Sequence, residues 1–131
     1  MTKPTSGHGP TNPEIPNDGI QRFASAVELK PEFEAEYRRL HSEVWPEVVA
    51  AIHRANFRNY SIYLMELGGR KLLISYMEYV GSDLESDQKI IADDPVTRDK
   101  WWPITDSHQE VLPGTPVGQQ WLPLERLMHL P

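Results

Sequence analysis

The chain has 131 residues, enough for one hydrophobic core, and its 19 acidic and 13 basic side chains give a net charge of -6 that disfavours nucleic acid and anionic membranes as partners. It contains no cysteine, which excludes disulfide bonds, thiolate catalysis and cysteine-ligated metal. No apolar run approaches the roughly 20 residues of a membrane helix, and the polar N-terminus lacks the apolar stretch of a signal peptide, so we expect a cytoplasmic protein.

The N-terminal segment differs in composition from the rest of the chain. Residues 1–18 hold four of the twelve prolines among small polar residues and have almost nothing to bury, so we predict a disordered tail. Residues 19–131 form the single predicted domain. The character of the chain changes from Ile20, and a first strand that ends before Lys30 is predicted by the alternation of one set of residues, Phe23, Ser25, Val27 and Leu29, with another, Arg22, Ala24, Ala26 and Glu28.

A helical stretch follows the first strand. It begins near Pro31, because proline is favoured at the first helical position. Pro46 removes a backbone N–H and disfavours helical backbone at Trp45. We therefore predict that the helix breaks or kinks between His41 and Trp45, and that a second helical piece runs from Pro46 to about Ala55.

Two strand-like segments come next, with a glycine pair between them. Residues 57–65 and 71–80 are rich in aromatic and branched aliphatic side chains, which favour strands. Gly68 and Gly69 accept positive φ angles, so this spacing predicts a β-hairpin.

Capping signals mark two further helices. Residues 82–85 fit a capping box, in which Ser82 caps a helix that runs to about Ala92. Asp94 and Pro95 then have the residue types of an N-cap and a first helical position, which predicts another helix.

The remaining elements complete a recognisable order. We expect Pro103 to interrupt the helix that begins at Asp94, and a loop at 112–118 to lead into a last strand at 121–130. The order of strand, helix, strand, strand, helices and strand matches an α+β, ferredoxin-like split βαβ fold with a four-stranded antiparallel sheet. Several strands carry large apolar residues on both sides, so the face without helices needs a cover. A second copy of the chain is the simplest cover, and we predict a homodimer of the dimeric α+β barrel type.

Of the five histidines, His41 is distinguished by its neighbour Tyr37. The two lie four residues apart, so on a helix both side chains leave the same face and can approach one ligand. The alternative is that Tyr37 and His41 lie on a half-buried helix face and are polar partners only of each other. Spacing alone favours this alternative. No histidine spacing typical of metal sites occurs, so we expect no metal. Structural or solvent-exposed roles are expected for His8, His53, His108 and His129.

Three other aromatic residues are candidates for a binding pocket. Tyr60 alternates in phase with Ile62 and Leu64, so its hydroxyl lies either at the edge of the core or in a cleft. On a helix the side chains of Trp101 and Trp102 point in directions about 100° apart, so they cannot both face one core patch. We expect one in the core and the other in a pocket, where indole faces pack against the C–H faces of sugars.

Five short motifs carry a family resemblance. They are Glu36-Tyr37-Arg38-Arg39-Leu40-His41, Val44-Trp45-Pro46-Glu47, Asn59-Tyr60-Ser61-Ile62-Tyr63-Leu64, Trp101-Trp102 with Thr105-Asp106, and Leu130-Pro131. In this order and spacing the chain resembles the L-rhamnose mutarotase family, which comprises small ferredoxin-like dimers that interconvert the anomers of 6-deoxyhexoses. The resemblance implies that His41 is the proton donor and that Tyr37, Tyr60, Trp101 and Trp102 bind the sugar. It requires no cofactor.

Parts of the chain depart from the rhamnose pattern. The loop at 112–120 lacks the Asn-Pro-Asp-Asn run that is associated with rhamnose enzymes. Residues 78–81 and 109–110 are closer to a branch linked to L-fucose. L-rhamnose is therefore the expected substrate, and L-fucose is the alternative.

The expected chemistry is acid-base ring opening, in which an acid protonates the ring oxygen while a base removes the proton of the anomeric hydroxyl. Histidine suits this task because both of its protonation states are accessible near neutral pH. The rival enzyme class is the ferredoxin-like dimeric monooxygenase, which holds an aromatic substrate or haem in an apolar pocket. A sugar sensor without catalytic activity is the third hypothesis. The mixture of tyrosine, histidine and tryptophan favours a polyol over an apolar ligand.

Overall fold

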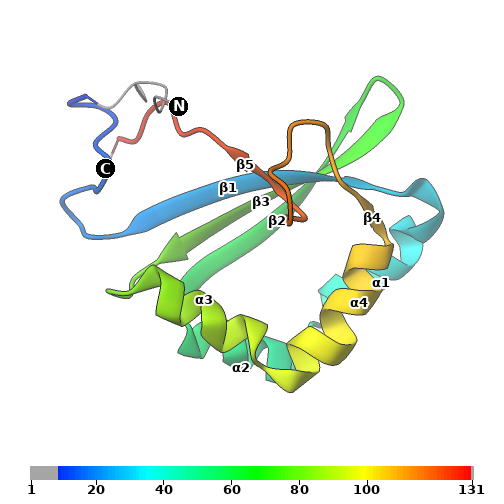
Figure 1. Ribbon diagram of the computed structural model, residues 1–131. Helices are drawn as coiled ribbons and strands as arrows, with labels where there is room; N and C mark the ends of the chain where they lie inside the picture. The colour runs from blue at the N-terminus through cyan, green and yellow to red at the C-terminus, as the bar shows by residue number, and fades with distance from the viewer. Residues whose placement is uncertain (1–8, 131) are drawn as a thin grey trace.

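The computed structural model describes residues 9–130, which form one curled antiparallel sheet with helices on one of its faces (Figure 1). The strand order is β2-β3-β1-β4, and β5 also pairs with β1. The α+β fold class is confirmed. The elements are β1 (Gln21–Leu29), η1 (Pro31–Phe33), α1 (Glu34–Ser42), α2 (Pro46–Arg54), β2 (Phe57–Leu67), β3 (Arg70–Tyr79), α3 (Leu84–Ala92), η2 (Thr97–Trp101), α4 (Trp102–Ser107), β4 (Gln109–Glu110) and β5 (Leu122–Leu124).

The hairpin between β2 and β3 forms as predicted. Leu67 pairs with Arg70, and the two residues between them are Gly68 at φ 59° and Gly69 at φ 78°. Positive φ at both central positions is the geometry of a tight two-residue hairpin turn, which glycine adopts at no steric cost. The long strands β2 and β3 are therefore in register over most of their length.

The predicted break between the first two helices is confirmed. The helix α1 ends at Ser42 and α2 begins at Pro46, with Trp45 in an extended conformation at ψ 135°. Proline at the first helical position explains both the extended residue before it and the new helix axis. Leu40 of α1 and Val48 of α2 then pack in one buried cluster with Trp101.

The cap of α3 lies one residue later than predicted. Asp83, and not Ser82, is the N-cap, and its carboxylate accepts hydrogen bonds from the backbone N–H of Ser86 at 3.2 Å and from the Ser86 hydroxyl at 2.9 Å. A carboxylate that accepts two hydrogen bonds and lies at the positive end of the helix dipole is favoured over a hydroxyl at this position.

The prediction that Pro103 interrupts the following helix is wrong. The Asp94 side chain caps the helix start, as expected, by accepting from the N–H of Thr97 at 2.9 Å. The chain then makes a π-helical turn, η2, and continues as α4 to Ser107. In a regular α-helix the ring of Pro103 would clash with the carbonyl of Asp99, and the wider turn just before it relieves that clash.

The predicted last strand at 121–130 is also wrong in extent, since only β5 is a strand in this segment. Both β4 and β5 pair with the same edge of β1, with Glu28 opposite Glu110 and Ala26 opposite Leu122. Residues 111–121 therefore loop out between two pieces of one edge. The sheet has five strands in place of four because this edge is divided.

The two ends of the described chain lie together. Asn12 is buried and its side-chain oxygen accepts from Arg126 Nε at 2.7 Å, while the N–H of His129 donates to the carbonyl of Thr11 at 2.8 Å. Residues 9–18 thus rest on the C-terminal segment, and the rest of the predicted tail, residues 1–8, lies outside the described residues. Within residues 9–130, no helix is both long and apolar enough to cross a membrane.

Candidate active site

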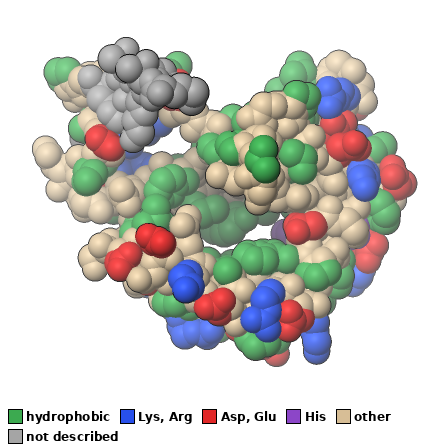
Figure 2. All heavy atoms as spheres, in the orientation of Figure 1, with side chains coloured by type: hydrophobic (Ala, Val, Ile, Leu, Met, Phe, Trp, Pro, Cys, Tyr) green, Lys and Arg blue, Asp and Glu red, His purple; other side chains and the backbone are tan. Residues whose placement is uncertain are grey.

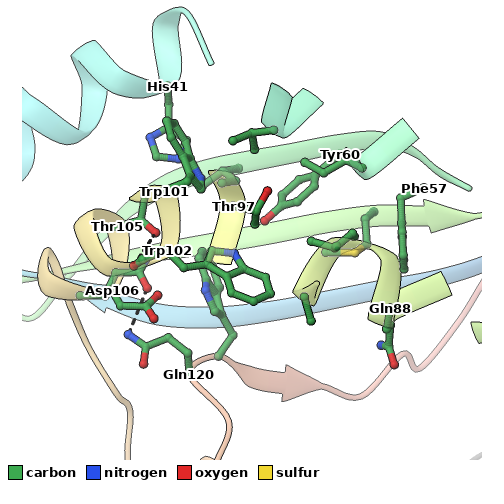
Figure 3. Close-up of a pocket in the computed structure, with 18 of the residues that line it drawn as sticks. His41, Phe57, Tyr60, Gln88, Thr97, Trp101, Trp102, Thr105, Asp106 and Gln120 are labelled. Atoms are coloured by element: carbon green, nitrogen blue, oxygen red, sulfur yellow. Dashed lines mark hydrogen bonds between the residues drawn. The ribbon is translucent and has the colours of Figure 1, made fainter. Parts of the chain in front are cut away.

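A cavity of about 570 Å³ lies between the helices and the concave face of the sheet. Figure 2 shows it as a hollow lined mainly by hydrophobic side chains, and this volume is typical of a site for a small molecule. The fold brings all five predicted site residues to its wall, although they come from α1, β2, η2 and α4 (Figure 3). They are Tyr37, His41, Tyr60, Trp101 and Trp102.

The helix α1 positions Tyr37 and His41 as a stacked pair. Their ring centroids lie 4.0 Å apart with an interplanar angle of 20°. His41 Nδ1 lies 2.9 Å from the backbone oxygen of Tyr37. Because a carbonyl can only accept, Nδ1 carries a proton, and in the neutral ring the lone pair is therefore on Nε2. His41 presents a base to the cavity when it is neutral.

The surroundings of His41 favour this neutral form. Burial lowers its pKa from the ordinary value of 6.5, and the nearby His108 lowers it further, against the opposing effect of the hydrogen bond to the Tyr37 carbonyl. Desolvation disfavours the charged imidazolium. At neutral pH the resting state of His41 is therefore the proton acceptor.

The Tyr37 hydroxyl accepts a hydrogen bond from Gln109 of β4, which is itself held by Gln120 of the following loop. Gln109 Nε2 donates to the Tyr37 hydroxyl at 3.4 Å, and Gln120 Nε2 donates to Gln109 Oε1 at 3.2 Å. The hydroxyl oxygen accepts this hydrogen bond, so its own proton remains available for a ligand. Burial raises the pKa of Tyr37, which keeps the phenol protonated over the physiological range.

A β-bulge turns Tyr60 towards the cavity. The register between β2 and β3 shifts between Arg58 and Ser61, and Asn59 lies at φ 51°. The extra residue lets Phe57 and Tyr60 line the same cavity, although strict alternation would place them on opposite faces. Burial raises the pKa of Tyr60 to about 12, so its hydroxyl is a hydrogen-bond donor at neutral pH.

The two tryptophans both line the cavity but differ in burial. Trp101 is 6% exposed, packs against Leu40 and Val48, and lies 5.2 Å from the ring of His41. Trp102 is 37% exposed and offers an indole face to the hollow. One indole thus supports the histidine from the core, and the other is available to a ligand.

Comparison with known proteins identifies the family. The family model described as L-rhamnose mutarotase matches residues 22–130. The L-rhamnose mutarotase of Acidiphilium cryptum is 30% identical over 112 residues, which cover 86% of this chain and all of the relative. The chain belongs to the L-rhamnose mutarotase family.

Other members of the L-rhamnose mutarotase family are also similar to this chain. The L-rhamnose mutarotase of Jannaschia sp. is 30% identical over 116 residues, covering 86% of this chain and all of the relative. That of Brucella anthropi is 48% identical over a shorter stretch of 46 residues, or 35% of this chain and 43% of the relative. The crystal structure of an L-rhamnose mutarotase from Formosa agariphila shares the fold, with a TM-score of 0.57, 22% identity, and coverage of 85% of this chain and 99% of that one. The ferredoxin-like fold is thereby confirmed, and family membership favours the mutarotase over the monooxygenase class.

The cavity wall also contains polar residues that the sequence analysis did not assign to a site. Asp106, Gln109 and Gln120 all line the cavity. A signal for Asp106 was present, since it lies four residues after Trp102 and so shares its helical face. No such signal exists for Gln109 and Gln120, because they meet only through the pairing of β4 and β5 with β1.

Among residues 9–130, no group of three or more histidine, aspartate or glutamate side chains is placed to hold a metal ion. None of the other described histidines lines this cavity, although His53 lines an adjoining pocket that shares His41 and Tyr60 with it. His108 is 2% exposed, stacks on Phe33 at 4.7 Å and lies 3.4 Å from Glu36. His53 is near the end of α2, and His129 is in the C-terminal segment. His8 lies outside the described residues.

Proposed function

We propose that the protein is an L-rhamnose mutarotase, an isomerase that interconverts the α and β anomers of the free sugar. The observation that carries this proposal is the orientation of the His41 ring in the cavity. Its Nδ1–H is held by its own helix, which leaves Nε2 as a base in a cavity with a free indole face and two tyrosine hydroxyls. Family membership supports the choice of sugar.

In the proposed reaction, His41 Nε2 removes the proton of the anomeric hydroxyl as the bond between C1 and the ring oxygen breaks, and an acid gives the ring oxygen a proton. The aldehyde rotates about C1–C2 and closes on its other face. Tyr37 and Tyr60 donate hydrogen bonds to the sugar oxygens, and Trp102 packs on its C–H face. A positioned base of this kind is typically worth about 10² to 10⁴ in rate.

Exchange NMR on the anomeric protons tests the function directly. We expect the exchange rate of L-rhamnose to rise in proportion to enzyme concentration, and that of L-fucose to rise less. A larger effect on L-fucose would assign the enzyme to the L-fucose-linked branch of the family. Binding of sugar without faster exchange would make the protein a sensor, and an effect on neither sugar would end the proposal.

We also propose a homodimer, formed through the face of the sheet that carries no helices. Leu73 and Ser75 of β3 are buried on the helical side, so Leu72 and Ile74 point to the outer side. Their cross-strand partners are Met65 and Tyr63, which are 41% and 62% exposed. An apolar patch of this kind on a sheet is typical of a subunit interface.

The mass in solution tests the dimer. Light scattering coupled to gel filtration should give about twice the chain mass of 15.1 kDa, and Tyr63→Glu should give a monomer. Glu66→Lys, on a polar position of the same strand, serves as the control and should leave the dimer intact. A monomeric native protein at high concentration would contradict this part of the proposal.

For location and further partners, we propose the cytoplasm and no macromolecular ligand other than a second copy. A net charge of -6 supports the absence of binding to nucleic acid or anionic membrane. Fractionation of the source cells, followed by detection with an antibody, tests the location.

A further inference from the structure

Asp106 places a carboxyl group in the cavity wall. It follows Trp102 by one turn on α4 and lines the hollow, whereas His41 reaches the same hollow from α1 (Figure 3). Asp106 is the acidic residue in the cavity wall, and His41 is the histidine. The two side chains therefore line one cavity from different helices.

The carboxylate of Asp106 has no partner among residues 9–130: no hydrogen bond or ion pair reaches it there. Its neighbours along the chain differ in this respect. Asp94 caps a helix through Thr97, and Asp99 pairs with Arg98 at 2.8 Å. A carboxylate that lines a cavity without a protein partner is available to a ligand.

The electrostatic environments of the two groups bring their proton affinities closer. Burial raises the pKa of Asp106 above its ordinary value of 3.8, and burial lowers the pKa of His41 below 6.5. These shifts move the two pKa values towards each other, which lowers the free-energy cost of the form with a neutral imidazole and a protonated carboxyl group. Such a pair can act as acid and base in either direction.

We propose that Asp106 is the second catalytic residue, which exchanges a proton with the ring oxygen of the sugar while His41 exchanges one with the anomeric oxygen. This inference rests on the proposed mutarotase function. In ring opening, neutral His41 takes the anomeric hydroxyl proton, C1 becomes an aldehyde as its bond to the ring oxygen breaks, and protonated Asp106 gives that oxygen its proton. The products are the open-chain sugar, an imidazolium and a carboxylate.

Ring closure reverses these two transfers after rotation about C1–C2. The imidazolium of His41 then donates to the aldehyde oxygen, and the Asp106 carboxylate takes back the proton of the hydroxyl that attacks C1. His41 is thus a base in one direction and a donor in the other, as microscopic reversibility requires. Each turnover returns the pair to its starting form, with one proton on the aspartate.

Other titratable groups face this pair. Tyr37 on α1 and Tyr60 on β2 have pKa values raised by burial, so both stay protonated where the pair titrates. His108, at the end of α4, lies close enough to His41 to lower its pKa and has Glu36 beside it. His108→Gln therefore separates the influence of this residue on a pH profile from that of Asp106.

The test compares L-rhamnose exchange by the native enzyme and by Asp106→Asn over a range of pH, after subtraction of the uncatalysed rate. The active form carries one proton on the pair, so the native profile should be bell-shaped, with an optimum between the ordinary values of 3.8 and 6.5. Asp106→Asn should lower kcat by about 10² or more at that optimum. The pH profile of Asp106→Asn should have a single limb, in which the exchange rate rises with pH as His41 loses its proton.

Asp99→Asn is the matched control, because Asp99 lies on η2 and does not line the cavity. It should keep the native rate and the bell shape. Sugar affinity, measured by quenching of indole fluorescence, should be unchanged in Asp106→Asn, which separates catalysis from binding.

The inference would be overturned if folded Asp106→Asn kept the native rate and the bell-shaped pH profile. It would also be overturned if His108→Gln lost the bell shape while Asp106→Asn kept it. If Asp106→Asn does not fold, Asp106→Glu decides the question. We expect it to keep both limbs with a kcat at least about tenfold lower, because its carboxyl group is displaced, and an unchanged kcat would contradict the role. Failure of the native enzyme to accelerate exchange would instead contradict the proposed function.

Discussion

The ring of His41 stacks on the ring of Tyr37, its helical neighbour, at 4.0 Å, while its Nδ1 donates to the Tyr37 carbonyl at 2.9 Å. One residue therefore fixes both the plane and the tautomer of the other. A carbonyl on the same helix cannot move away when a ligand binds, so the orientation of the proposed base is set before the sugar arrives. This pre-organisation is the basis of the predictions that concern Tyr37 and His41.

Tyr37→Phe should lower kcat by about tenfold to 10³ with little change in stability. The ring remains to stack on His41, and the backbone carbonyl remains to accept from Nδ1, but the hydroxyl that donates to the sugar is lost. Gln109 loses its acceptor, which costs about 1 kcal/mol. Anomer exchange and urea unfolding measure the two effects. Full activity in a folded variant would show that the hydroxyl plays no part.

The stability of the protein should depend on the protonation of His41. Its folded pKa lies below the unfolded value of 6.5, so at pH values below 6.5 the unfolded chain binds the additional proton first. The contribution of His41 to the free energy of unfolding is thus intact above pH 6.5 and falls as the pH drops below it. His41→Gln should lose this part of the pH dependence. Urea unfolding of both proteins at pH 7.5 and pH 5.5 tests the sign, and a larger acid loss in the variant would contradict it.

Asn59 should be sensitive to side-chain shape because its backbone is in the left-handed region at φ 51°. We expect Asn59→Val to destabilise the fold by about 1–2 kcal/mol and to lower activity, since relief of the strain would remove the bulge that directs Tyr60. Asn59→Gly loses the same hydrogen bond to Glu78 but tolerates this φ. It should therefore be the more stable and more active variant, and equal loss in both would assign the effect to the amide.

The adjacent tryptophans should give opposite results when each is replaced by alanine. Trp101→Ala should destabilise the protein by about 3–5 kcal/mol, because the indole is 6% exposed within a buried cluster. Trp102→Ala should change stability little and raise KM for the sugar, because its indole faces the hollow. Thermal unfolding and saturation kinetics distinguish the two. A raised KM with no loss of stability at Trp101 would reverse the assignment.

Local signals in the sequence predicted much of the fold. Pro46 placed the break between α1 and α2, and Gly68 with Gly69 placed the hairpin turn, because these residues restrict or free the backbone by themselves. Pro103 was misjudged for the opposite reason. Its effect on the helix depends on whether the preceding turn can widen to a π turn, and no local rule specifies that.

Some features of the candidate site could likewise be predicted from local sequence, and others depend on strand pairing. Tyr37 and His41 were predictable as a pair because four residues on a helix place two side chains on one face, and the family motifs added Tyr60, Trp101 and Trp102. The bulge at Asn59, which lets Tyr60 reach the cavity, depends on how β2 pairs with β3. Such pairing joins residues that are distant in the chain.

The sequence by itself indicated five residues of this protein's cavity wall and its membership of a family, since periodicity, turn residues and motif spacing are local properties. Only the tertiary structure decided which proton each aromatic group can offer and that Asp106, Gln109 and Gln120 belong to the same site. The physical reason is that a hydrogen-bond partner, burial and the resulting pKa depend on neighbours brought together by folding across the sheet, not by position along the chain.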